Sequence, residues 1–120
     1  MAIDTKLYAE MARRGDPKPI WITEFGAPTG TDLMAVSDRR QARILTSAVQ
    51  DHPPWVERVF LYGGRDRGLN TSDREQNFGF VREDFSDKPS RRAVELAISE
   101  RATHSAMVSA RLVYLAPQLT

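Results

Sequence analysis

Hydrophobic residues recur three and four positions apart in three segments of the chain, a spacing typical of helices with one buried face. The apolar stripes consist of Leu7 and Met11, of Ala42, Leu45 and Val49, and of Ala93, Val94, Leu96 and Ala97. Residues that can cap a helix, and the prolines and glycines that end one, set the expected bounds. We expect helices from Asp4 or Thr5 to Arg14, from Ser37 or Asp38 to the residues before Pro53, and from Pro89 or Ser90 onward.

Two short segments rich in β-branched and aromatic residues are predicted to be strands. The first covers residues 20–23 and ends near Glu24, and the second covers residues 58–62 and is ended by a pair of glycines. The polar and glycine-rich stretches after them predict loops over residues 25–36 and from residue 63 to about 87.

The alternation of helices and strands predicts the fold class. Strands separated by helical segments are expected to be parallel and joined by right-handed crossovers, which makes the fold α/β with about two parallel strands and three helices. Parallel strands are normally buried on both faces, so residues 1–101 are expected to be a slice of a larger sheet or barrel. Residues 102–120 form a tail of open structure, in which residues 102–109 could extend the third helix and residues 111–115 could be a strand or an irregular end.

The charge balance excludes two classes of partner. Among 120 residues, 17 Lys and Arg nearly balance 16 Asp and Glu, and the net charge is +1. A chain without a strong positive field is not expected to bind nucleic acid or an anionic membrane. Cysteine is absent, and residues 1–15 lack the apolar stretch of an export signal. We therefore expect a cytoplasmic product without disulfides, although a longer parent protein could be secreted.

The stretch KPIWITEFGAPTG, residues 18–30, places a carboxylate where an apolar run breaks into glycine, proline and threonine. Its WITEFG resembles the seventh strand of the retaining (β/α)8-barrel glycoside hydrolases, the clan that contains cellulases, β-mannanases and β-xylosidases. The stretch VFLYGGRDRGLNTSDREQNFGFVREDFSDKP, residues 59–89, resembles their eighth strand, a long loop with an FG, and a KP that opens the last helix. The resemblance covers roughly residues 5–99 and implies a partial TIM barrel.

This resemblance implies a glycosidase that acts on a β-linked oligosaccharide or polysaccharide. Glu24, at the carboxyl end of its strand, would be the nucleophile that attacks the anomeric carbon. Tyr62 is the nearest match to the aromatic side chain on which the sugar stacks. Asp66 follows the second strand on the side of Glu24, where it would contact the sugar or brace the loop. Neither a metal nor an organic cofactor is implied.

One part of the family pattern is missing. The acid/base glutamate of the clan follows an asparagine at the end of the fourth strand, and this chain contains no such Asn-Glu pair. Asp66 is a poor substitute, because a general acid must be held protonated whereas the flanking Arg65 and Arg67 favour an ionised carboxylate. The isolated chain is therefore expected to be inactive or nearly so.

Other interpretations remain open from the sequence. Glu24 could simply cap a loop or pair with an arginine, and Tyr62 could belong to the core instead of a sugar site. Trp21, Phe60 and Phe78 are predicted to be core residues. No His, Asp and Glu set has the spacing of metal ligands. The chain could also be a non-catalytic barrel remnant that uses exposed strand edges to bind sugar, a second copy of itself, or a polypeptide carrying the N-terminal strands of a barrel.

Overall fold

The computed structural model describes residues 2–115 and contains the predicted order of helix, strand, helix, strand and helix. The elements are α1 (Ala2–Arg13), β1 (Ile20–Phe25), α2 (Asp38–Gln50), β2 (Val56–Leu61), the short 3₁₀ helix η1 (Arg74–Gln76) and α3 (Pro89–Leu115). The predicted starts of α2 and α3 are confirmed, whereas β2 begins and ends slightly earlier than the sequence indicated.

Local chemistry explains where the helices begin and end. Ser37 caps α2, since its hydroxyl accepts a hydrogen bond of 3.2 Å from the backbone N–H of Arg40. Pro89 is the first residue of α3, a position where its missing N–H costs no helical hydrogen bond. Gly15 follows α1 with a φ of +78°, a left-handed conformation that glycine adopts without steric cost. The cues read from the sequence are therefore the ones that operate in the structure.

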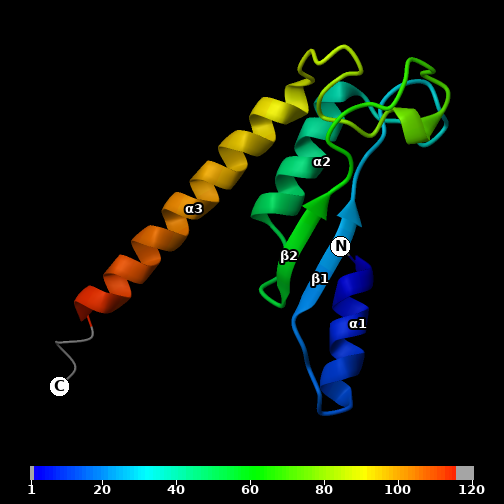
Figure 1. The fold of residues 1–120 in the computed structure, drawn as a ribbon. Helices are drawn as coiled ribbons and strands as arrows, with labels where there is room; N and C mark the ends of the chain where they lie inside the picture. The colour runs from blue at the N-terminus through cyan, green and yellow to red at the C-terminus, as the bar shows by residue number, and fades with distance from the viewer. Residues whose placement is uncertain (1, 116–120) are drawn as a thin grey trace.

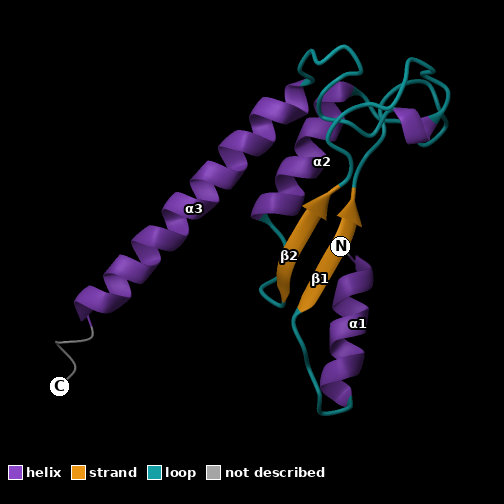
Figure 2. Cartoon of the chain, viewed as in Figure 1, coloured by secondary structure: helices purple, strands orange, loops and turns teal. Residues whose placement is uncertain are grey.

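The two strands form a parallel sheet, which confirms the α/β fold class. Figure 1 shows α2 lying against the sheet, α3 running along the far side of α2, and α1 beside the start of β1. The long loops after β1 and β2 gather beyond the carboxyl ends of both strands (Figure 2). Because the strands are parallel, residues that end one strand lie close to residues that end the other.

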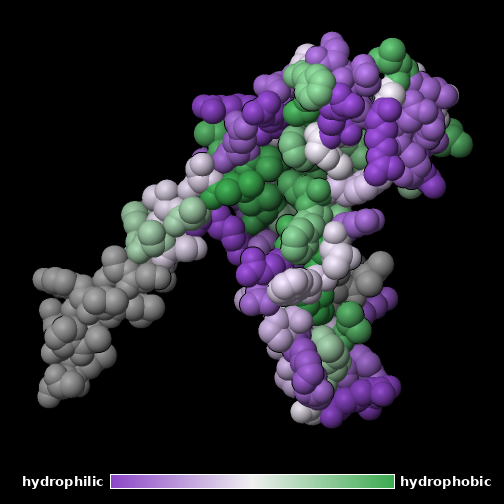
Figure 3. Space-filling view, viewed as in Figure 1, coloured by the Kyte–Doolittle hydropathy of each residue, from purple (hydrophilic) through white to green (hydrophobic). Residues whose placement is uncertain are grey.

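The core lies between the sheet, α2 and α3. Its buried apolar side chains are Ala42, Leu45, Ala48, Val56, Val94 and Ala97. Leu96, which the periodicity assigned to the apolar stripe of the third helix, is 45% exposed and lies outside this core. Figure 3 shows hydrophobic residues concentrated where α3 leaves the side of α2.

Helix α1 is held by an aromatic contact. The ring of Tyr8 stacks on Trp55, just before β2, with the ring centroids 4.8 Å apart and the planes 12° from parallel. On the exposed side of α1, Glu10 accepts hydrogen bonds from Arg13 and Arg14, which lower the pKa of its carboxyl. In each of these ion pairs both side chains are exposed to solvent, so the pairs contribute little to stability.

The end of α3 projects beyond the rest of the molecule. The guanidinium of Arg101 donates hydrogen bonds of 3.0 and 3.3 Å to the carbonyls of Val49 and Gln50, at the carboxyl end of α2. Residues 102–107, which follow, are all exposed. The radius of gyration is accordingly 18.1 Å, against about 14 Å for a compact chain of this length.

The structure confirms that residues 102–109 extend the third helix, which continues to Leu115. Residues 102–115 extend α3, so the interpretation of residues 111–115 as a strand is wrong. Residues 116–120 lie outside the described part of the chain. No helix within residues 2–115 is both long and apolar enough to cross a membrane.

Candidate active site

A register shift in the sheet determines where the side chain of Glu24 lies. Ile22 is opposite Val59 and Phe25 is opposite Leu61, so β1 contains one more residue than β2 between these pairs. Side chains alternate between the faces of a regular strand, and an extra residue resets the alternation. Ile22 and Phe25 therefore share the face that packs on α2, and Glu24 lies on the opposite face.

A second shift lies at the other end of the sheet. Ile20 is opposite Val56 and Trp21 is opposite Arg58, which leaves Glu57 as the extra residue of β2. Val56 is 2% exposed and faces α2. The side of the sheet away from α2, which we term the open face, consequently carries Trp21, Thr23, Glu24, Glu57, Arg58 and Phe60, all of them exposed.

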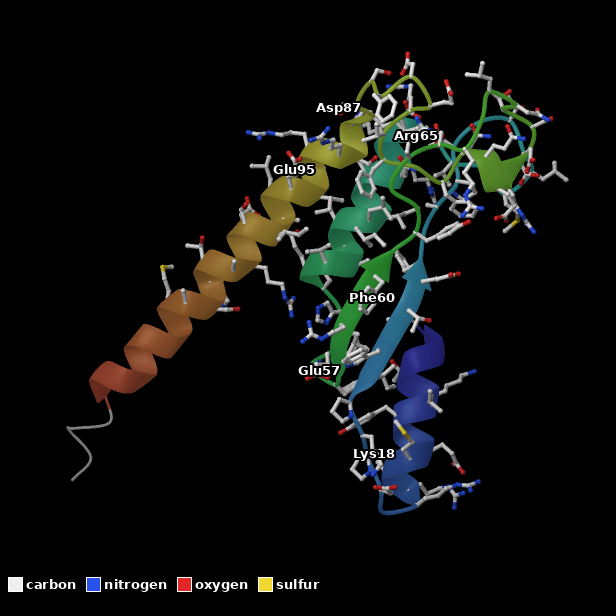
Figure 4. All side chains as sticks on the ribbon, viewed as in Figure 1. Lys18, Glu57, Phe60, Arg65, Asp87 and Glu95 are labelled. Carbon is white, nitrogen blue, oxygen red and sulfur yellow. The ribbon has the colours of Figure 1, made fainter. Side chains whose placement is uncertain are left out.

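The aromatic residues of the open face contradict the sequence prediction. Trp21 and Phe60 were expected in the core, yet they are 54% and 49% exposed, because no described element covers this face. Trp21 donates a hydrogen bond of 2.6 Å from Nε1 to the Glu57 carboxylate, and the Arg58 guanidinium lies 5.3 Å from its ring centroid. Figure 4 shows Glu57 and Phe60 on β2, with Arg65 among the loops beyond the strand ends.

Glu24 opens onto a cavity at the carboxyl end of the sheet. The cavity has a volume of about 370 Å³ and is lined by Glu24, Phe25, Gly26, Tyr62, Arg67, Glu75 and Phe78. Within the described part of the chain, the Glu24 carboxylate makes no hydrogen bond or ion pair, so it neither caps a loop nor pairs with an arginine. It is therefore available to a molecule that enters the cavity.

Tyr62 and Phe78 form an aromatic wall of this cavity. Their ring centroids are 5.2 Å apart in an edge-to-face arrangement, and Phe78 is half-buried where a core position was expected. The backbone N–H of Tyr62 donates to the Phe25 carbonyl at 2.8 Å, which continues the pairing of β1 and β2. Gly26 is required here, since a Cβ on it would overlap the Tyr62 carbonyl and the Phe78 ring. The wall thus lies directly beside the residues that follow Glu24.

Asp66 is part of a buried polar cluster, not of the cavity wall. The residue is 6% exposed, and both carboxylate oxygens lie 2.8 Å from the Lys88 ammonium. Lys88 also donates to the Thr29 hydroxyl at 2.9 Å and to the Asn77 carbonyl at 3.3 Å. We call Thr29, Asp66, Asn77 and Lys88 the Lys88 cluster. It joins the loop after β1, the loop after β2 and the start of α3.

The geometry of Asp66 favours a bracing role over contact with a sugar. Its Oδ1 accepts a further hydrogen bond of 2.8 Å from the backbone N–H of Gly79. The cation that pairs with the Asp66 carboxylate is Lys88. The expectation that Arg65 or Arg67 provides the positive charge beside this carboxylate is therefore wrong. The arginines point elsewhere because Asp66 turns inward while its neighbours remain exposed.

A second buried polar residue ties α2 to the same loops. Gln41 is fully buried, and its side-chain amide donates to the carbonyls of Ala27 and Gly79 at 3.0 and 3.1 Å. Its amide oxygen accepts a hydrogen bond of 2.7 Å from the hydroxyl of Ser90, at the start of α3. The loops that surround the cavity are thus attached to both long helices.

Three residues that shape the site have no clear sequence signal. In the sequence, Lys88 stands out only as part of the KP that opens the last helix, and nothing around Gln41 in the apolar stripe of α2 indicates burial. Arg67 lies in a polar loop, where its only sequence feature is its place next to Asp66. A buried lysine or glutamine depends on partners distant in sequence, so periodicity does not reveal it. Within residues 2–115, no three or more His, Cys, Asp and Glu side chains are arranged to hold a metal ion.

Known structures similar to the chain are glycoside hydrolases. A family 39 glycoside hydrolase from the gut symbiont Bacteroides cellulosilyticus WH2 is 31% identical over 69% of this chain, with a TM-score of 0.54. GH5_18 from Streptomyces cattleya, solved in complex with GlcNAc, is 28% identical over 68%, with a TM-score of 0.52. The chain has a glycoside hydrolase-like fold.

A third structure supports the fold alone. A GH2 β-galacturonidase from Eisenbergiella tayi, bound to galacturonate, is 21% identical over 80% of this chain, with a TM-score of 0.60. The chain spans only 17% of the family 39 protein and 20% of each of the other two. No protein-family model and no curated protein matches the sequence. The two parallel strands with their three helices correspond to a fragment of a glycoside hydrolase barrel.

Proposed function

We propose that the chain supplies the nucleophile of a retaining glycoside hydrolase, and that this nucleophile is Glu24. The observation that supports the proposal is the Glu24 carboxylate, which has no partner among the described residues, lies one residue before the end of a parallel strand, and opens onto an aromatic-walled cavity. Catalytic groups of (β/α)8 barrels lie at the carboxyl ends of the strands. The proposed substrate is a β-linked oligosaccharide or polysaccharide, which belongs to the same general class as the GlcNAc and galacturonate bound by the similar structures.

The proposed reaction has two steps. A Glu24 carboxylate oxygen attacks the anomeric carbon, and the bond to the leaving oxygen breaks as that oxygen receives a proton from a general acid. Water then attacks the same carbon, releases Glu24, and returns its proton to the same acid/base group. The net change of bonds is hydrolysis with retention of the anomeric configuration.

This mechanism also needs a second carboxyl group as general acid and base. It must lie about 5 Å from the nucleophile, and the oxygens of Asp66 are already committed to Lys88 and Gly79. This chain covers only 17% of the family 39 glycoside hydrolase and 20% of GH5_18. We propose that a polypeptide with the remaining strands of the barrel supplies the second carboxyl, and that the chain alone has little or no turnover.

A covalent trapping experiment tests the nucleophile without the missing acid. A 2,4-dinitrophenyl 2-deoxy-2-fluoro-β-glycoside has a leaving group that departs without protonation, so only the nucleophile is needed to form the adduct. We expect intact mass to increase by one fluorosugar, with the label on the peptide that contains Glu24. The matched control is Glu57→Gln, which removes an exposed carboxylate from the same face and should still be labelled. Labelling that persists in Glu24→Gln, or its absence in the folded wild-type chain, would contradict the proposal.

A second candidate function is binding of a partner chain through the open face. The observation that favours it is the exposure of Trp21 and Phe60, two large aromatic side chains side by side with ring centroids 6.1 Å apart. Both sheet edges also lack a neighbouring strand within the described residues. Uncovered apolar faces and strand edges commonly lead to association. In this case a second copy of the chain would cover the face.

The double variant Trp21→Ser with Phe60→Ser is expected to weaken self-association by about tenfold or more, since interface aromatics often contribute over ~1 kcal/mol each. Sedimentation velocity over a range of protein concentrations measures the effect. The control is Leu33→Ser with Leu69→Ser, which removes two exposed apolar side chains from the loops. A wild-type chain that sediments as a monomer at every concentration would argue against this function.

A further inference from the structure

Arg67 differs from the other basic residues in the loops around the cavity. Those residues are engaged within the protein: Arg65 with the Glu83 carbonyl and the Phe85 ring, Arg74 with Glu75, Arg82 with Asp38 and the Asp87 carbonyl, and Lys88 with Asp66 and Thr29. Within the described residues, the side chain of Arg67 makes no hydrogen bond or ion pair. Its guanidinium lies over the ring of Tyr62, 5.5 Å from the centroid.

The backbone at Arg67 is held firmly on both sides. Its N–H donates to the Gln76 carbonyl at 2.9 Å, and the preceding Asp66 is fixed by the buried pair with Lys88. The following Gly68 packs so closely on the Gln76 side chain that a Cβ would overlap it. The Arg67 side chain therefore extends from a fixed backbone, and its guanidinium packs on the Tyr62 ring. These two constraints preorganise the guanidinium for binding a ligand.

The position of Arg67 changes what the aromatic wall can bind. Two groups already lie against the Tyr62 ring: Phe78 packs on it in an edge-to-face arrangement, and the Arg67 guanidinium lies over it. A sugar that approaches this ring meets a guanidinium with five N–H donors and no acceptor. The planar arrangement of these donors matches a carboxylate, with which arginine forms paired hydrogen bonds.

We propose that Arg67 binds the carboxylate of an acidic sugar, so that the cavity selects a uronic acid residue over the corresponding neutral sugar. This inference rests on the proposed function, because the sugar is held beside Glu24. Among the described residues that line the cavity, Arg67 is the only cation, whereas Glu24 and Glu75 are acidic. An anionic ligand would be repelled by these carboxylates without a paired cation, so the preference for a uronic acid depends on Arg67 specifically.

The test compares binding of methyl β-D-glucuronide and methyl β-D-galacturonide with that of the corresponding glucoside and galactoside, by NMR titration of the full chain. We expect the wild-type chain to bind one of the uronides at least about tenfold more tightly than its neutral counterpart, because charge-assisted hydrogen bonds are involved. Arg67→Met should abolish the preference for the uronide. Arg67→Lys should retain part of it, since lysine keeps the positive charge but lacks the planar set of N–H donors that pairs with a carboxylate. Arg92→Met, which removes an exposed charge on α3, is the matched control and should behave as wild type.

The outcomes separate this inference from the assignment of Glu24. Equal affinity for uronides and neutral sugars, a preference that survives Arg67→Met, or no binding of any of these sugars at millimolar concentration would overturn the role of Arg67. If the fluorosugar reagent still labels Glu24 in that case, the proposed nucleophile stands. If Arg67-dependent uronide binding is found without labelling, the inference stands as a binding site and the nucleophile does not.

Discussion

Replacing Lys88 by methionine is expected to lower the free energy of unfolding by about 3–5 kcal/mol, the usual cost of removing one partner of a buried ion pair. The side chains of Lys88 and Asp66 are only 2% and 8% exposed, so the remaining carboxylate would be buried without its cation. The Thr29 hydroxyl and the Asn77 carbonyl lose a donor as well. This loss is a large fraction of the stability of a typical domain, which is about 5–15 kcal/mol.

Urea unfolding followed by circular dichroism measures this effect. Lys18→Met is the matched control, because Lys18 forms an ion pair with Asp16 that is exposed on both sides and should contribute less than about 1 kcal/mol. The double variant Lys88→Met with Asp66→Leu should recover part of the loss, since no unpaired charge is then buried. A change below about 1 kcal/mol in Lys88→Met would show that the carboxylate of Asp66 is solvated and that the cluster does not hold the loops.

Replacing Gln41 by leucine is expected to cost about 3 kcal/mol. The two side chains are similar in size, so the loss comes mainly from hydrogen bonds. The carbonyls of Ala27 and Gly79 lose their donor and the Ser90 hydroxyl loses its acceptor, each at a cost of roughly 1–3 kcal/mol when buried. Partial access of water to the loop carbonyls would reduce the total.

The same unfolding measurement applies to this variant, with Gln50→Leu as control. Gln50 lies on the same helix but is exposed, and its side chain makes one hydrogen bond, to Glu100. We expect a difference of at least about 2 kcal/mol between the two variants. Similar costs for both would mean that helix propensity, not the buried hydrogen bonds, determines the effect of the substitution.

Much of the fold could be predicted because it depends on local signals. The apolar spacing of the helices, the cap at Ser37 and the proline at the start of α3 each act over a few neighbouring residues. The two register shifts are different, since an extra residue in a strand is defined only by its partner strand. Simple alternation would place Trp21 on the face opposite Glu24, whereas the shift brings both to the open face.

The site was only partly predictable for a similar reason. Glu24 could be recognised as a candidate because it lies next to the last residue of a short strand with a clear sequence pattern. The role of Asp66 depends on Lys88, and that of Arg67 depends on the path of a long loop. A sequence pattern identifies residues that can be charged or aromatic at a strand end, but the partners of these residues are set by tertiary packing.

The Lys88 cluster also has a consequence for the order of folding. Its hydrogen bonds join Thr29 to Lys88 across 59 residues and Asp66 to Lys88 across 22, and Gln41 reaches Ser90 across 49. A contact between residues far apart in sequence forms only when the intervening chain closes into a loop, which costs conformational entropy. We therefore expect the loops around Glu24 to become ordered late, when the start of α3 docks on α2, and to open together when that docking is lost. The cavity is then assembled in a single cooperative step by a contact made outside it.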